Sequence, residues 1–132
     1  MKPEELLYTK SHEWIHFATD QAGETIATVG LSQFALKTLT DLVFMELPEE
    51  GRTLDRDEVF GEIESVKAVS EMYAPVGGEV IAVNRDAVDH LEQLADAPYV
   101  NGWLIKIRVT DDNRSTLMDF PTYEKQCENE SH

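Results

Sequence analysis

The chain has 132 residues, of which 26 are acidic and 11 are basic, so its formal net charge at pH 7 is −15. A surface this acidic repels nucleic-acid phosphates and anionic lipids, and we expect no nucleic-acid partner and no membrane binding. An apolar fraction of 42% suits one domain with a hydrophobic core, and no segment has the apolar length that spans a bilayer. The acid excess either favours partners with basic docking surfaces or simply keeps the protein in solution.

The N-terminal residues 1–5 lack the hydrophobic region of a signal peptide and the arginine-rich character of a transit peptide. We therefore expect a bacterial cytoplasmic protein. A mitochondrial matrix protein whose transit peptide has been removed would look similar.

Cysteine and histidine, which often carry chemistry, give weak signals in this chain. Cys127 is the only cysteine and lies in a polar C-terminal stretch, so we interpret it as an incidental thiol. His12 and His16 have the i, i+4 spacing of a helical metal pair, but the segment around them is predicted to be extended. We expect no metal site.

The first third of the chain predicts two strands followed by a helix. Aromatic and β-branched residues predict strands over 8–17 and 24–29, with a turn over 20–23. Apolar residues then recur at helical spacing over 31–42, and Ser32 is available as the N-cap of that helix.

From residue 43 onward the pattern changes to short strands separated by proline and glycine. A helical or irregular segment is expected over 86–95, and a short helix over 113–126 that Pro121 interrupts. The predicted strands cover 43–47, 59–65, 69–73, 79–83 and 102–110.

One internal repeat is visible in this second part. The pattern Met-x-x-Pro-x-x-Gly followed by Leu or Ile occurs over 45–54 and again over 72–81. Two copies are too few for a solenoid but suit two quasi-equivalent half-sheets that pack on each other. Lys67 falls between the copies, so we expect it on the bend that joins the half-sheets.

Lys67 has the sequence context of a lysine that another protein modifies. Glu62 and Glu64 precede it, the small Ala68 follows it, and a Pro-Val-Gly-Gly turn lies beyond at 75–78. A lysine at a tight bend is held out in water. A catalytic lysine instead needs desolvation, which lowers its pKa and makes it nucleophilic.

Seven segments, spread over nearly the whole chain, form an ordered set. They are YTKSHEW at 8–14, VGLSQFA at 29–35, ELPEEG at 46–51, FGEIESVKA at 60–68, YAPVGGEV at 73–80, PY at 98–99 and GWLIKI at 102–107. A single lysine in an acidic stretch would be weak evidence, whereas the ordered set is specific. In this order the segments resemble those of the glycine cleavage system H-protein family, whose members are lipoyl carriers.

The resemblance implies a mainly β fold, in the form of a biotinyl/lipoyl-like flattened β-sandwich or barrel of two quasi-symmetric sheets. It implies a short helix after strand 2 and a short C-terminal helix, in a single domain over 1–132 with a lipoyl-type core at about 25–110. It also implies that Lys67 carries lipoate in amide linkage and that the chain is a carrier and not an enzyme.

The partners implied by the resemblance are a pyridoxal-phosphate glycine decarboxylase, a tetrahydrofolate-dependent aminomethyltransferase, dihydrolipoyl dehydrogenase and a lipoyl ligase or lipoyltransferase. The carrier would shuttle the aminomethyl group of glycine between the first two. The cleft that protects the loaded arm would contain Ser11, Glu13 and Glu71. The alternative is that Ser11 is a polar residue at a strand end and that both glutamates are solvated members of the acidic surface. Candidates for ligase recognition are Glu62, Glu64 and Gly78, and we expect a monomer.

The departures from the family pattern are small. Gly77 replaces a common serine, and Glu71 stands where aspartate is also common. A biotin carrier would have methionines beside the lysine in place of Val66 and Ala68. A 2-oxoacid dehydrogenase lipoyl domain would have aspartate before the lysine.

Two alternatives belong to other functional classes. A hydrolytic or Schiff-base enzyme is excluded because no nucleophile–base set, phosphate loop or metal cluster can be assembled. An interaction module with an unmodified Lys67 remains open, as does donation of lipoyl groups to other complexes.

Overall fold

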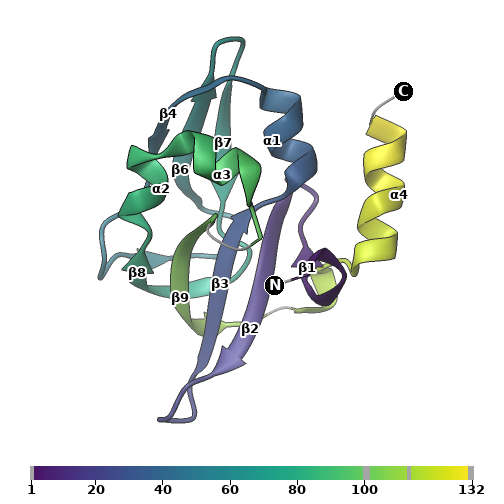
Figure 1. The fold of residues 1–132 in the computed structure, drawn as a ribbon. Coiled ribbons are helices and arrows are strands. Elements are labelled where there is room, and N and C mark those ends of the chain that lie inside the picture. Colours follow the sequence, from purple (N-terminus) through teal and green to yellow (C-terminus); the bar gives the residue numbers. More distant parts are fainter. Residues whose placement is uncertain (1, 100–101, 113, 131–132) are drawn as a thin grey trace.

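The computed structural model describes residues 2–99, 102–112 and 114–130. Two antiparallel sheets pack on each other, with short helices at their edges (Figure 1). A mainly β fold of two sheets, as expected from the sequence, is therefore confirmed. None of the described helices is long and apolar enough to cross a membrane.

The six-stranded sheet has the order β1-β2-β3-β9-β8-β5 and the three-stranded sheet the order β4-β6-β7. The strands are β1 Leu7–Tyr8, β2 Glu13–Thr19, β3 Thr25–Leu31, β4 Leu42–Glu46, β5 Thr53–Leu54, β6 Val59–Ser65, β7 Val69–Tyr73, β8 Gly77–Val83 and β9 Trp103–Asp111. The helices are α1 Gln33–Leu39, α2 Arg85–Asp89, α3 Leu91–Asp96 and α4 Phe120–Glu130, with 3-10 turns η1 Pro3–Glu5 and η2 Arg114–Thr116.

The main core lies between the two sheets. Strand residues that point to the same face recur every second position, so each sheet contributes one apolar face. Val29 and Ile107 of the larger sheet and Met45, Ile63 and Met72 of the smaller sheet are all at most 2% exposed and belong to one cluster. Burial of this cluster is the main force that holds the sheets together.

The predicted strand over 8–17 is wrong in one respect, because a turn interrupts it. β1 and β2 pair with each other, and the turn between them is closed by hydrogen bonds from Thr9 N to Glu13 O (3.0 Å) and from His12 N to Thr9 O (3.2 Å). His12 has φ +76°, a left-handed conformation uncommon for residues other than glycine. The turn contains neither glycine nor proline, so the sequence carries no ordinary signal for it.

The predicted helix after the second long strand is confirmed, with a different end. The side chain of Ser32 accepts a hydrogen bond from Ala35 N (3.2 Å), which makes it the expected N-cap. The helix stops at Leu39, where Thr40 adopts φ +63°, and Leu42 begins β4 instead of ending the helix.

The segment over 86–95, predicted to be helical or irregular, forms two short helices, α2 and α3. The prediction for the C-terminal helix is corrected. Pro121 is the second residue of α4 and does not interrupt it, because a residue in the first turn of a helix needs no intrahelical N–H partner. Asn113, the start of that predicted helix, lies outside the described residues.

The internal repeat has a structural counterpart. Both copies begin in the smaller sheet, at Met45 of β4 and Met72 of β7, and both end in the larger sheet, at Leu54 of β5 and Ile81 of β8. β4 and β7 flank β6, while β5 and β8 pair with each other. The expectation that Lys67 joins two half-sheets is wrong, since its turn connects β6 and β7 within one sheet.

A second, smaller core attaches α4 to the body of the protein. Leu6, Tyr8, Trp14 and Tyr123 are buried together, and the rings of Tyr8 and Tyr123 stack with centroids 4.3 Å apart. The Tyr123 hydroxyl lies 2.5 Å from Ser32 Oγ and 2.7 Å from His12 Nδ1. One side chain of α4 therefore links the start of α1 to the β1–β2 turn.

We predict that Tyr123→Phe lowers the free energy of unfolding by about 1–3 kcal/mol, because the buried Ser32 hydroxyl and the partly buried His12 ring lose a partner while the Tyr123 ring stays. Urea unfolding measures the change, and amide exchange should show α4 opening more often. Tyr73→Phe is the matched control, since the Tyr73 hydroxyl has no hydrogen-bond partner among the described residues. Equal stabilities of the two variants would contradict the prediction.

Candidate functional site

Lys67 sits at the tip of the tight β6–β7 hairpin, which projects at the top of Figure 1. Ser65 N donates to Ala68 O (2.8 Å), and the buried Ser65 hydroxyl accepts from Lys67 N (3.2 Å) and Ala68 N (3.1 Å). The backbone of the turn is thus fixed by one side chain. The Lys67 side chain is exposed and, within the described part of the chain, its ammonium has no hydrogen-bond or ion-pair partner.

The surroundings of Lys67 are apolar and anchored to β4. Val66 N donates to Asp41 O (3.0 Å), which ties the turn to the start of that strand. Exposed apolar side chains on neighbouring positions are typical of surfaces that other molecules contact. Those near the turn are Val43 (57% exposed), Phe44 (46%), Val66 (71%) and Val69 (61%).

The outer face of the three-stranded sheet carries a row of carboxylates. Glu62 of β6 pairs with Glu46 of β4 on one side and with Glu71 of β7 on the other. Glu64, one row closer to Lys67, lies on the same face. Because side chains alternate along a strand, Ser70 points to the opposite face from Glu71.

A cleft of about 250 Å³ opens on the inner side of the hairpin. Ser70, three residues beyond Lys67, belongs to its wall, so the cleft begins close to the lysine. One wall is apolar and comes largely from α1, while the opposite end is polar. The lining residues are Ser11, His12, Leu31, Phe34, Ala35, Thr38, Leu39, Ser70 and Glu130.

Glu13 lies directly behind the polar end of the cleft and is fully buried. Its Oε1 accepts hydrogen bonds from the hydroxyls of Thr9 (2.6 Å) and Ser11 (2.5 Å), and its Oε2 accepts from Tyr73 N (3.3 Å). Burial raises the pKa of the Glu13 carboxyl even though these three donors favour the charged form. Ser11 lines the cleft and Glu13 does not, so the serine hydroxyl stands between the carboxylate and the cavity.

Of the three residues predicted for the cleft, the fold brings Ser11 and Glu13 together and leaves Glu71 apart. The Glu71 side chain is exposed on the outer face beside Glu62 and is not among the residues that line the cleft. Successive side chains of a strand point to opposite faces, and Glu71 occupies an outward position of β7. The sequence of β7 alone does not show which of its faces points inward.

Gly78, predicted as a ligase-recognition candidate, has a packing role in this fold. A Cβ at this position would collide with the Arg108 carbonyl oxygen and with the Ile107 side chain of the neighbouring β9. Glycine is therefore required for β8 and β9 to approach each other. The other two candidates, Glu62 and Glu64, lie on the outer face next to the Lys67 turn.

Three residues of the site were missed by the sequence prediction. Ser65 had a usable signal, since a serine two positions before a turn residue commonly accepts backbone hydrogen bonds. The sequence pattern around His12 indicated only a possible metal ligand and gave no sign of its contact with α4. Glu130 had no signal, because its partner His12 is 118 positions away in the sequence.

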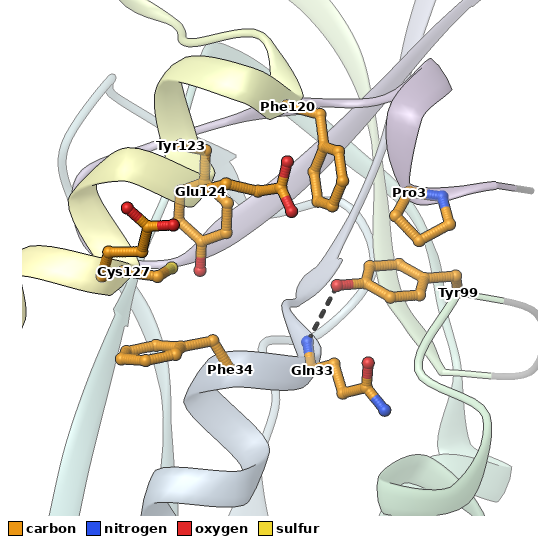
Figure 2. Close-up of a pocket in the computed structure, with 9 residues that line it drawn as sticks. Pro3, Gln33, Phe34, Tyr99, Phe120, Tyr123, Glu124 and Cys127 are labelled. Atoms are coloured by element: carbon orange, nitrogen blue, oxygen red, sulfur yellow. Dashed lines mark hydrogen bonds between the residues drawn. The ribbon is translucent and has the colours of Figure 1, made fainter. Parts of the chain in front are cut away.

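A second crevice, of about 340 Å³, lies between α4 and α1 and adjoins the cleft at Phe34, which lines both. Figure 2 shows Phe120 and Tyr123 of α4 facing Gln33 and Phe34 of α1, with the Tyr99 hydroxyl accepting a hydrogen bond from Gln33 N (2.9 Å). Of the described residues that line it, none belongs to β6 or β7.

Cys127 also lines this second crevice. Burial raises the pKa of its thiol, so the group stays protonated and weakly nucleophilic near neutral pH. Among the described residues, no group of three or more His, Cys, Asp or Glu side chains is arranged to hold a metal ion.

Comparison with known proteins gives one consistent family. The sequence profile described as Glycine cleavage H-protein matches residues 6–130. A glycine cleavage system H protein of Rhodopirellula baltica is 50% identical over 125 residues, which is 95% of this chain and 94% of that protein. One of Corynebacterium jeikeium is 42% identical over 122 residues, covering 92% and 94% of the two chains.

The fold is shared as well. The crystal structure of a glycine cleavage system H protein from Mycobacterium marinum superimposes with a TM-score of 0.85 at 37% identity, covering 95% of this chain and 98% of that one. Agreement of profile, sequence and fold over almost the whole length shows that the chain belongs to the glycine cleavage H-protein family, the non-catalytic lipoyl carriers of the glycine cleavage system.

Proposed function

We propose that Lys67 is the residue to which lipoate is attached and that the lipoyl arm carries the aminomethyl group of glycine between enzymes. The observation that carries this proposal is the Lys67 ammonium, unpaired among the described residues, at the tip of a hydrogen-bonded hairpin beside a cleft of suitable chemistry. An exposed amine on a fixed backbone is accessible to a modifying enzyme. The enzyme then needs to order only the side chain.

The cleft fits a lipoyl group. Lipoate supplies a dithiol/disulfide pair on a flexible alkyl chain, joined to lysine through an amide that removes the ammonium charge. Leu31, Phe34 and Leu39 offer apolar contact for the alkyl chain, and Ser11 offers a polar group at the far end. An arm held against these walls would be shielded from water, which protects a hydrolytically sensitive cargo.

Ser11 and Glu13 supply the polar end of the site. The hydroxyl groups of Thr9 and Ser11 each donate a hydrogen bond to the Glu13 carboxylate. The Ser11 oxygen therefore keeps an electron pair that can accept a bond from a protonated amine. The buried carboxylate would then act on the amine through the serine. For Glu71 the outer face favours contact with partner proteins over contact with the arm.

The proposed partners are glycine decarboxylase, aminomethyltransferase, dihydrolipoyl dehydrogenase and a lipoyl ligase or lipoyltransferase. The apolar side chains around Lys67 and the carboxylates of the outer face offer them a surface with both apolar and anionic contacts. Glu62 and Glu64 remain the candidates for ligase recognition. We place the protein in the cytoplasm of a bacterium, as a monomer.

The attachment site is tested by intact-mass measurement of the protein purified from its native host. We expect a lipoyl-sized increment on the wild type and none on Lys67→Arg, because arginine keeps the charge but cannot form the amide. Lys125→Arg is the control and should keep the increment. An unmodified wild type would favour the interaction module, and a biotin-sized increment would favour a biotin carrier.

Ser65→Ala tests the role of the fixed turn. Removing the hydroxyl leaves Lys67 N and Ala68 N without an acceptor, so we expect faster amide exchange at both and a loss of about 1 kcal/mol in stability. Slower lipoylation by a ligase in vitro should accompany these changes. Ser65→Thr retains the hydroxyl and should restore the amide exchange rates, the stability and the lipoylation rate. Normal exchange in Ser65→Ala would show that the hydroxyl does not hold the turn.

Glu13→Gln tests the buried carboxylate through pH. Because burial raises the pKa of Glu13, the folded protein binds this proton more tightly than the unfolded chain does. The free energy of unfolding should therefore fall as pH rises from the ordinary carboxyl range through the raised pKa. The glutamine variant lacks this fall, so its stability relative to the wild type should increase across that window in urea unfolding. Parallel curves would mean that Glu13 titrates normally.

A further inference from the structure

The polar end of the cleft contains a carboxylate that the proposed function does not use. Among the described residues that line the cleft, Glu130 is the only acidic one. It belongs to the last turn of α4, and its side chain is 44% exposed. Glu13, by contrast, is fully buried behind Ser11.

Two donors hold the Glu130 carboxylate in place. Its Oε1 lies 3.1 Å from His12 Nε2, and its Oε2 accepts a bond from the Gln126 amide at 2.7 Å. The same Gln126 amide donates to Lys10 O (2.9 Å), which attaches this turn of α4 to the β1–β2 turn. Each carboxylate oxygen can accept a second bond, so both keep capacity for a ligand.

The hydrogen bonds around His12 form one connected network. Ala35 N donates to Ser32 Oγ, which lies 2.5 Å from the Tyr123 hydroxyl, and that hydroxyl lies 2.7 Å from His12 Nδ1. His12 Nε2 donates to the Glu130 carboxylate. Burial raises the pKa of the Tyr123 hydroxyl, which therefore stays protonated near neutral pH.

The pKa values of the two carboxyl groups are shifted in opposite directions. The Gln126 amide and His12 lower the pKa of Glu130, whereas burial raises that of Glu13. A cation that enters the cleft meets the Glu130 charge directly, and meets Glu13 only through the Ser11 hydroxyl.

We infer that Glu130, oriented by His12 and Gln126, is a cargo-binding residue whose carboxylate pairs with the protonated amine at the end of the arm. The inference rests on the proposed function and adds a residue to it. The pairing protects the cargo, because a protonated amine has no electron pair with which to break the C–S bond. A free amine would form a C=N bond as sulfur leaves as thiolate, and water would convert the released iminium to formaldehyde and ammonium.

The test compares Glu130→Gln with Glu124→Gln, which removes the same charge from the same helix but faces the second crevice. Both variants and the wild type are lipoylated, checked by mass, and loaded with the cargo by the decarboxylase. We expect Glu130→Gln to release ammonia roughly two- to fivefold faster than the other two, the range for a partly exposed ion pair. Salt at about 1 M should bring the wild type close to the variant.

A second measurement does not depend on breakdown. The Glu130 carboxyl is titrated by NMR in the lipoylated protein before and after loading, and its pKa should fall on loading because a cation favours the carboxylate. A purely structural Glu130 would show no such fall. Equal ammonia release from both variants together with an unchanged titration would overturn the inference. A wild type that is not lipoylated or does not load would instead overturn the proposed function.

Discussion

The Glu13 carboxylate joins the two sheets behind the polar end of the cleft. It belongs to β2 of the larger sheet and accepts a hydrogen bond from Tyr73 N of β7 in the smaller one. Burying a carboxylate is unfavourable unless donors surround it, and the hydroxyls of Thr9 and Ser11 supply the other two bonds. Those hydroxyls come from the β1–β2 turn, so one buried charge fixes both sheets and the turn. The position of Ser11 in the cleft follows from this network.

The cleft is assembled from segments that are far apart in the sequence. The β1–β2 turn, α1, β7 and the end of α4 each contribute part of its lining. The Tyr123 hydroxyl connects three of them, since it bonds Ser32 at the start of α1 and His12 in the turn. α4 therefore contributes to the site as well as to stability. In Figure 1 it runs beside α1 at the edge of the molecule, where its last turn can reach the cleft.

Features that depend on neighbouring residues were predictable from the sequence, and features that depend on long-range contacts were not. The Ser32 N-cap, the alternation of β9 and the Lys67 turn are local, and the structure contains all three. The turn at His12 escaped prediction because tertiary hydrogen bonds stabilise a left-handed residue that carries no glycine signal. The contribution of Glu130 depends on a contact between the two ends of the chain. No periodicity can encode such a contact.

The two carboxylates near the cleft, the buried Glu13 and the partly exposed Glu130, have different roles that suit a carrier. A fully buried charge would bind a cation strongly but would also slow its departure, because both groups would have to be rehydrated as they separate. Glu130 is almost half exposed, so its attraction is weaker, screened by salt, and easily replaced by a group on a partner enzyme. Glu13 acts from behind Ser11 and fixes the geometry without contacting solvent. A site that must protect its cargo in water and release it to an enzyme needs both a rigid element and an exchangeable one, and the cleft contains one of each.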